Sequence, residues 1–157
     1  MQSRTRRVFV ALCAAFLLFS YSSTETFAFS LQDTDGAEIA LHDYKGEQVL
    51  LLFFTTWCEV CQEELAMLAE NKQLFSEAGI SLIAVNMTDD ELNERVVEEV
   101  AKQLPFPVVL DPDQLASRQY GVLGVPMTIA VNEDGEEVSR FFGPSSLEQL
   151  LVAFDNS

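Results

Sequence analysis

Two apolar runs dominate the hydrophobic pattern of this chain. Residues 49–54 and 80–85 are mostly aliphatic or aromatic and lack the regular polar alternation of a strand with one face in water. Short continuous apolar runs of this kind are typical of strands that are covered on both faces. The pattern therefore predicts two central strands at residues 48–55 and 80–86, and a shorter strand at residues 108–110.

Helical patterns follow both central strands. Residues 59–78 place leucine and phenylalanine at spacings of three and seven, and Gly79 then ends the predicted helix. Thr88 and Glu91 have the spacing of a capping box, which predicts a polar helix from this point to about Leu104.

Two turn signals predict β-hairpins near the two ends of the folded region. Asp35-Gly36 lies inside residues 29–42, and residues 132–135 separate two predicted strands at residues 127–131 and 136–142. Two further helices are predicted at residues 113–120 and, from a capping-box match at Ser145 and Glu148, at residues 145–154. The order of elements predicts an α/β fold: a mixed central sheet with helices on both faces and an N-terminal β-hairpin.

The first 28 residues have the composition of an export signal. Residues 1–7 contain three arginines, residues 8–21 are apolar, and residues 26–28 are a candidate cleavage site. The apolar run is shorter than the roughly 20 residues of a spanning helix, but its flanks extend it. A cleaved signal peptide and an uncleaved membrane anchor are both retained as alternatives. Either one places residues 29–157, the expected single domain, in the periplasm or another extracytoplasmic space.

The charge of the chain is strongly acidic. Its 157 residues include 25 acidic and 9 basic side chains, a formal net charge of −16. Such a surface disfavours nucleic acid and anionic lipid as partners. It is expected to keep the protein solvated, with attraction of basic client segments as a further option.

Cys58 and Cys61 carry the strongest chemical signal. They follow a predicted buried strand directly and open a predicted helix, where unpaired backbone N–H groups and partial positive charge stabilise a thiolate. The pair encloses too short a loop to staple a fold. The spacing therefore predicts thiol–disulfide exchange, in which Cys58, nearer the helix start, attacks and Cys61 resolves. Trp57 is expected to form an apolar rim beside Cys58.

A second signal lies in residues 121–128, where Pro126 comes just before a predicted strand. Proline cannot donate a hydrogen bond to a sheet, so its place here is unusual. A cis Val125–Pro126 bond and an ordinary trans proline at the strand start are both consistent with the sequence. If this loop faces the thiols, the backbone of Val125 would pair with an extended client segment.

Together these motifs resemble the thioredoxin superfamily. Residues 54–61, followed by residues 121–126, carry the resemblance, and residues 31–36 with the helix inserted at residues 90–104 narrow it to exported TlpA/ResA-type thiol–disulfide oxidoreductases. That group includes proteins of cytochrome c maturation. The resemblance covers nearly all of residues 29–154. It implies a thioredoxin fold, a redox-active centre at Cys58 and Cys61, and a cis-proline at Pro126.

Three features bear on how closely the chain matches these families. Leu52 occupies the place of a buried acid in cytoplasmic thioredoxins, whereas Glu64 matches a glutamate of the ResA-like proteins. Glu64 is therefore a candidate for managing the thiol protons, with a solvated helix carboxylate as the alternative. Glu59-Val60 replaces the frequent Glu-Pro between the cysteines, and because this dipeptide tunes the redox potential, the sequence leaves the direction of exchange open.

Three rival functions are set against this prediction. A metal site would need about four ligands, and His42, the single histidine, lies far from the cysteines in sequence. A peroxiredoxin-type thiol peroxidase is favoured by the Thr-x-x-Cys at Thr55 but disfavoured by Leu51, where that class has proline. A client-binding module with incidental thiols is the third.

The preferred prediction is an extracytoplasmic protein disulfide reductase. Its expected partners are disulfide-containing proteins and a membrane thiol donor that recharges it, with no bound cofactor and no metal ligands.

Overall fold

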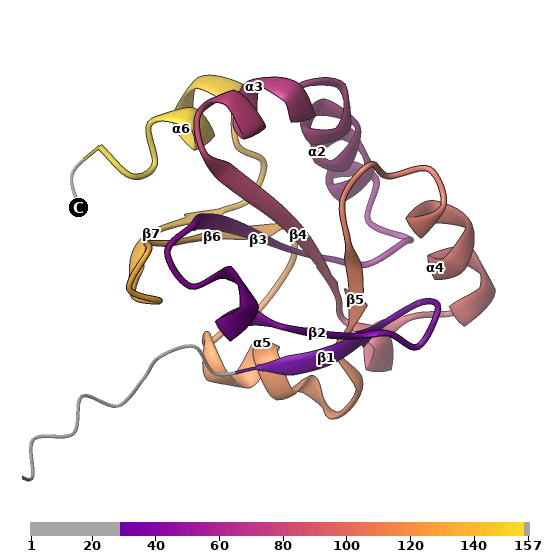
Figure 1. The fold of residues 1–157 in the computed structure, drawn as a ribbon. Helices are drawn as coiled ribbons and strands as arrows, with labels where there is room; N and C mark the ends of the chain where they lie inside the picture. The colour runs from indigo at the N-terminus through magenta and orange to yellow at the C-terminus, as the bar shows by residue number, and fades with distance from the viewer. Residues whose placement is uncertain (1–28, 156–157) are drawn as a thin grey trace, which may run out of the picture.

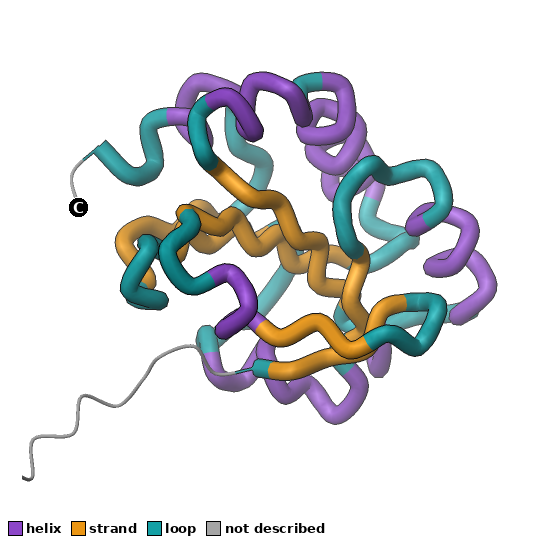
Figure 2. The backbone as a smooth tube through the Cα atoms, viewed as in Figure 1, coloured by secondary structure: helices purple, strands orange, loops and turns teal. Residues whose placement is uncertain are grey.

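The computed structural model describes residues 29–155, so the leader predicted at residues 1–28 lies outside the described residues. Helices pack against both faces of one sheet (Figure 1). The alternation of strands and helices along the chain is followed most easily in Figure 2. This is the mixed sheet with helices on both faces that the sequence predicts, which confirms the fold class.

Within the described residues, seven strands form the sheet in the order β2-β1-β5-β4-β3-β6-β7. Strand β3 (Gln48–Phe54) lies parallel to β4 (Ile80–Asn86) and antiparallel to β6 (Met127–Val131). Strand β5 (Val108–Leu110) pairs in parallel with β4 on its other side. The remaining strands are antiparallel to their neighbours: β1 (Ser30–Asp33), β2 (Glu38–Ala40) and β7 (Glu137–Phe142).

Strand β3 is buried on both faces because successive side chains of a strand point to opposite sides. The odd-numbered side chains from Val49 to Phe53 enter one core, and the even-numbered ones from Leu50 to Phe54 enter a second. The helices divide in the same way: η1 (Leu41–Tyr44) and α5 (Leu115–Gln119) cover the first core, and α2 (Glu59–Glu70), α3 (Lys72–Glu77), α4 (Glu94–Ala101) and α6 (Leu147–Leu151) cover the second.

Both predicted hairpins are present. In the first, Leu31 pairs with Ile39, and Gly36 has a φ of 82°, a left-handed conformation that glycine adopts without steric cost. In the second, Met127 pairs with Phe142 across strands β6 and β7. The first hairpin attaches to the sheet through antiparallel pairing of β1 with β5.

The helix predicted over residues 59–78 is two helices, so that prediction is wrong in its continuity. Helix α2 ends and α3 begins at Asn71, whose φ of −107° and ψ of 15° are not helical. The Asn71 side-chain amide donates to the carbonyl of Met67 over 2.8 Å. Asparagine competes in this way with the helical backbone pattern, which is why hydrophobic periodicity alone did not locate the break.

Both predicted capping boxes are wrong in position. Thr88–Asp90 forms the 3₁₀ turn η2, and α4 is capped by Asn93, whose side chain accepts from the amide of Arg95. The last helix is capped by Ser146 with Gln149, one residue after the predicted pair, and it ends at Leu151. Residues 113–120 likewise divide, because Asp113 and Gln114 have positive φ and end the 3₁₀ turn η3 (Pro112–Gln114).

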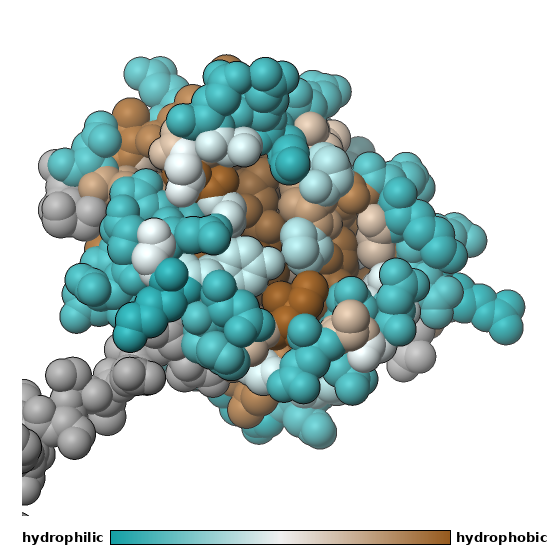
Figure 3. All heavy atoms as spheres, viewed as in Figure 1, coloured by the Kyte–Doolittle hydropathy of each residue, from teal (hydrophilic) through white to brown (hydrophobic). Residues whose placement is uncertain are grey.

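The face drawn in Figure 3 has a hollow with apolar side chains inside and hydrophilic side chains around it. Part of this apolar surface belongs to a groove between helices α2 and α4. Of the helices in residues 29–155, none has the length and apolar character that crossing a membrane requires.

Candidate active site

The active-site segment connects the end of strand β3 to the start of helix α2. The apolar strand ends at Phe54, and Cys58 is the N-cap residue of α2, with extended backbone angles of −82° and 102°. Its backbone N–H donates to the carbonyl of Thr55 over 3.3 Å, which closes the turn between strand and helix. The sulfur of Cys58 in turn accepts from the backbone N–H of Cys61 over 3.2 Å. The sulfur thus takes the part that a serine or aspartate oxygen plays at other helix starts.

Cys58 and Cys61 form a disulfide, with their Cα atoms 5.2 Å apart. Their exposure differs: the Cys61 side chain is fully buried against α2 and the sheet, whereas Cys58 is half-buried. A thiolate at the N-cap is stabilised by the helix amides and the macrodipole, and access to solvent lets it attack. Of the two sulfurs, Cys58 is therefore the one that an incoming disulfide can reach.

Cys58 opens into a cleft of about 380 Å³. Val125 also lines this cleft, and the Val125–Pro126 peptide bond is cis, as the family resemblance implies. Val125 is half-buried, and Pro126 is buried at the start of strand β6. The structure therefore brings together the two motifs that sequence reasoning joined only through a resemblance.

Large apolar side chains project at the mouth of the cleft. Trp57 is 56% exposed and Leu123 is 94% exposed, and both line the cleft with Cys58. The Trp57 indole N–H donates to the carbonyl of Asp90 over 2.8 Å, which holds the ring in place. Leu123, which lies inside residues 121–128 but is not among the residues that the sequence singles out, lines the cleft together with Trp57. The sequence gives no signal for Leu123, because its exposure beside Cys58 is visible only in the folded structure.

Glu64 is buried, not solvated, with 3% of its surface exposed. Its Oε1 accepts from the hydroxyl of Thr128 on strand β6 over 3.0 Å, and no donor among residues 29–155 is within hydrogen-bond geometry of its Oε2. Burial raises the pKa of the Glu64 carboxyl above its ordinary value, and the approach of Thr128 and Ser145 opposes this shift in part. Glu64 lies one helical turn after Cys61, so a carboxyl group with a raised pKa sits on the buried side of the thiol pair.

A second carboxylate at the site was not among the sequence-predicted residues. Glu91 accepts hydrogen bonds from Thr56, two residues before Cys58, and from Asn86 at the end of strand β4. Sequence reasoning had placed Glu91 in a helix cap. Its hydrogen bonds instead join Thr56, which follows strand β3, to Asn86 at the end of strand β4.

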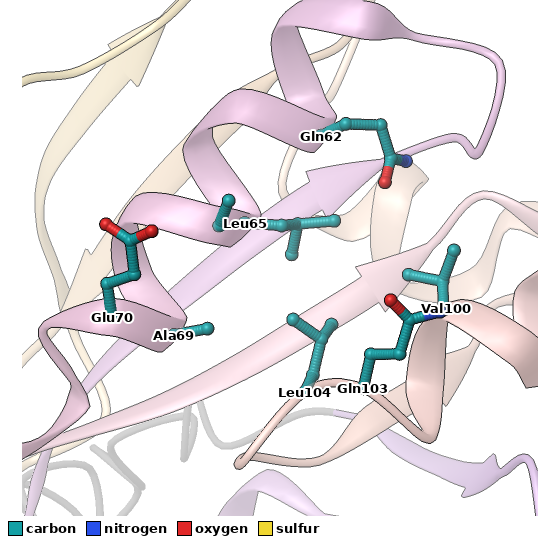
Figure 4. A pocket seen from close by; sticks show the side chains of 8 residues that line it. Gln62, Leu65, Ala69, Glu70, Val100, Gln103 and Leu104 are labelled. Atoms are coloured by element: carbon teal, nitrogen blue, oxygen red, sulfur yellow. The ribbon is translucent and has the colours of Figure 1, made fainter.

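The groove between α2 and α4 is a different feature from the cleft. It has a volume of about 270 Å³ and is lined by side chains of both helices, among them Leu65, Ala69 and Val100, and by Leu104 just after α4 (Figure 4). Neither cysteine is among its lining residues, so the redox centre is not in this groove.

Among residues 29–155, no group of three or more His, Cys, Asp and Glu side chains is arranged to hold a metal ion. His42 is exposed and lies 3.0 Å from the Asp43 carboxylate.

Comparison with known proteins agrees with this geometry. Residues 23–138 match the model of the AhpC/TSA family. The chain is 32% identical to sporulation thiol-disulfide oxidoreductase A of Bacillus subtilis over 124 residues, which is 78% of this chain and 74% of that protein. It is 37% identical to the thiol-disulfide oxidoreductase ResA of the same organism over 117 residues, 73% of this chain and 64% of ResA. The crystal structure of StoA from B. subtilis superimposes with a TM-score of 0.70 at 31% identity, covering 80% of this chain and 94% of StoA.

Proposed function

This chain is a thiol–disulfide oxidoreductase of the AhpC/TSA family, and we propose that it reduces disulfide bonds of exported proteins through the Cys58–Cys61 pair. Disulfide-containing proteins are its substrates. We further propose that the chain acts as a reductant and not as an oxidant, with separate roles for the individual residues of the site.

The difference between the two sulfurs is the observation that carries the proposal. Cys58 caps a helix, accepts an amide hydrogen bond and faces a cleft, whereas Cys61 is buried behind it. A sulfur that must meet a bulky protein disulfide needs access, and a sulfur that resolves the product needs only to reach its neighbour. This arrangement fits a two-step exchange between one exposed and one buried thiol.

The exchange begins with both cysteines reduced. The Cys58 thiolate attacks one sulfur of the client disulfide; a Cys58–client disulfide forms, and the second client sulfur leaves as a thiolate that takes up a proton. The Cys61 thiol then loses its proton and attacks Cys58 Sγ. The mixed disulfide breaks, the client leaves with two thiols, and Cys58–Cys61 is the oxidised product. Two electrons pass from the pair to the client, and another thiol protein returns them.

Glu64 would accept the proton that Cys61 loses in the second step. Its burial, its place one turn from Cys61 and its raised pKa support this role, since a general base needs proximity to the proton and a pKa near the working pH. On the client side, Trp57 would contact apolar side chains, and the backbone of Val125 before Pro126 would pair with an extended segment of the client.

The cellular setting belongs to the proposal as well. The composition of residues 1–28 supports export, with the domain either released by cleavage or tethered by this segment. An extracytoplasmic reductant needs a supply of electrons, which a membrane thiol donor would provide. Cytochrome c maturation is one pathway in which such a reductant acts. No bound cofactor is required, because the dithiol itself carries the electrons.

Reduction of insulin disulfides by the dithiothreitol-recharged protein tests the proposal. Wild-type protein is expected to precipitate the insulin B chain faster than dithiothreitol alone, and Cys58→Ala is expected to lose this acceleration while keeping its thermal unfolding transition. Wild-type turnover by Cys58→Ala would refute the mechanism. Equilibration of the Cys58–Cys61 pair with a glutathione buffer tests the direction: a reduction potential near that of thioredoxin, about −270 mV, supports a reductant, and one near DsbA, about −120 mV, indicates an oxidant.

A further inference from the structure

The carboxylate of Glu91 is directed at the active-site segment and not at the helix that follows it. Its Oε1 accepts from the backbone N–H of Thr56 over 2.6 Å, and its Oε2 accepts from the Thr56 hydroxyl over 2.5 Å. Helix α4 is capped instead by Asn93. The acidic residue that sequence spacing assigned to a helix start therefore serves a loop that lies 35 residues earlier in the chain.

Three hydrogen-bond donors surround the Glu91 carboxylate. Besides the two donors of Thr56, the side-chain amide of Asn86 donates to Oε1 over 2.6 Å, and Asn86 is completely buried. An ionised carboxylate accepts at both oxygens and donates at neither, so it satisfies all three donors. A glutamine in this place could keep its oxygen on the two N–H donors, but the Thr56 hydroxyl would then have to turn and accept from the glutamine NH₂ group. The carboxylate therefore differs from glutamine in that its hydrogen bonds are of the stronger, charge-assisted kind.

Asp90, the residue before Glu91, binds Trp57, the residue after Thr56 in the active-site segment. The carbonyl of Asp90 accepts from the indole N–H of Trp57 over 2.8 Å. On the other side, the Gln62 side chain donates to the carbonyl of Thr56 over 3.3 Å. Thr56 and Trp57, the two residues directly before Cys58, are therefore fixed by a segment from the far end of strand β4.

We propose that Glu91 is a positioning residue for the thiol–disulfide exchange. By accepting from both the backbone N–H and the hydroxyl of Thr56, it fixes the turn that sets the Cys58 sulfur over the first amides of α2 and the Trp57 ring at the mouth of the cleft. It acts through Thr56 and takes no part in the sulfur chemistry itself. The inference rests on the proposed function, since it assigns Glu91 to the alignment of the attacking sulfur.

Glu91→Gln tests this role, with Asp89→Asn as its matched control. Asp89 is an exposed acid of the same turn, and no side-chain hydrogen bond involves it within the described residues. Both variants remove one negative charge, but only the first removes it from the hydrogen bonds with Thr56. In the reduced Cys61→Ser background, alkylation of Cys58 by iodoacetamide at pH 7, followed by mass spectrometry of the Cys58 peptide, is expected to slow about five- to tenfold in Glu91→Gln, the size of the difference between a charge-assisted and a neutral hydrogen bond. Asp89→Asn is expected to react at the parent rate.

Tryptophan fluorescence gives a second readout, because Trp57 is the single tryptophan of the chain. Acrylamide quenching of Trp57 is expected to increase in Glu91→Gln and to stay unchanged in Asp89→Asn. A residue that only stabilised the fold would lower the unfolding temperature without changing the quenching of a folded sample. If alkylation and quenching in Glu91→Gln both equal those of Asp89→Asn, the inference is refuted.

If Glu91→Gln does not fold, Thr56→Val tests the same contact from the other side. It removes the hydroxyl donor alone, and its alkylation rate is expected to fall in the same direction. Where both variants fold, the double variant is expected to lose less than the product of the two single effects, since the two residues act through one contact. Independent effects would overturn the inference. Alkylation and quenching need no turnover, so a wild-type protein that fails to reduce insulin refutes the proposed function and leaves the role of Glu91 to be judged by its own measurements.

Discussion

The hydroxyl of Thr128 donates to Oε1 of Glu64 over 3.0 Å, across 64 residues of sequence. Thr128 lies two residues after Pro126 on strand β6, and Glu64 lies three residues after Cys61 on helix α2. This hydrogen bond therefore links the proline loop to the helix that carries the thiols. Thr128 also pairs in register with Leu52, the position at which cytoplasmic thioredoxins have an acid. Glu64, a buried acid, enters the same region from the helix and not from the strand.

The pH dependence of Glu64→Gln follows from the raised pKa of this carboxyl. When ionised, Glu64 places a negative charge next to the thiol pair and disfavours a second negative charge on sulfur. We expect the pH midpoint of Cys58 alkylation to move lower in Glu64→Gln, since the thiolate then forms without that charge. Rates of iodoacetamide reaction between pH 5 and 10 measure it, and an unaltered curve would remove Glu64 from the proton chemistry.

Stability provides an independent check of the same group. Because burial raises the pKa of Glu64 above 4.5, the folded state holds this proton more tightly than the unfolded chain. The stabilising contribution is complete below pH 4.5 and is lost as the pH rises through the folded pKa. Urea unfolding from pH 4 to pH 8 should show this loss in wild type but not in Glu64→Gln. Thr128→Val, which removes the donor to the carboxylate, should shift the loss to higher pH.

Cys61→Ser is expected to trap the exchange halfway. Cys58 can still attack a client, but the serine hydroxyl cannot displace the client sulfur, so a mixed disulfide accumulates. Non-reducing electrophoresis of the variant after incubation with oxidised insulin would show a product that dithiothreitol removes. The same variant separates the rival peroxidase: rapid consumption of hydrogen peroxide that persists in Cys61→Ser would favour peroxide as the substrate, and absence of any trapped adduct would count against the exchange mechanism.

Leu123→Ser is expected to lower kcat/KM for protein disulfides but not for small disulfides. Leu123 is 94% exposed at the mouth of the cleft, so its loss costs the fold little, but contact with a client would bury it. Loss of roughly 1–2 kcal/mol of apolar contact corresponds to a decrease in kcat/KM for insulin of about five- to thirtyfold. The rate with a small disulfide such as dithiobis(nitrobenzoate) should not change.

Leu92→Ser is the control for this prediction. Leu92 is 86% exposed but does not line the cleft. Equal losses in the two leucine variants, or an equal loss of Leu123→Ser with both disulfides, would mean that Leu123 makes no specific contact with the client.

Sequence by itself determined the elements whose signals are local. The unbroken apolar run of β3 identified a strand buried on both faces, the spacing of Cys58 and Cys61 at a helix start identified the chemistry, and Asp35-Gly36 identified a hairpin. These features depend on side-chain alternation, helix-end amides and turn conformations, all of which act within a few residues. The sequence did not predict the break at Asn71, where a side chain hydrogen-bonds to the helix backbone and interrupts a periodic hydrophobic pattern.

Tertiary structure decided the environment of the carboxylates near the site. The chain contains 25 acidic residues, and the sequence singled out Glu64 only through a resemblance; it did not show that Glu64 is buried while Glu63 beside it is exposed, or that Glu91 reaches Thr56. Burial and partners arise only when the register of β3 with β4 and β6 brings distant segments together. A carboxyl group acquires its pKa and its hydrogen bonds from that assembled environment, because desolvation and donor geometry are properties of the packed fold and not of neighbouring residues in the sequence.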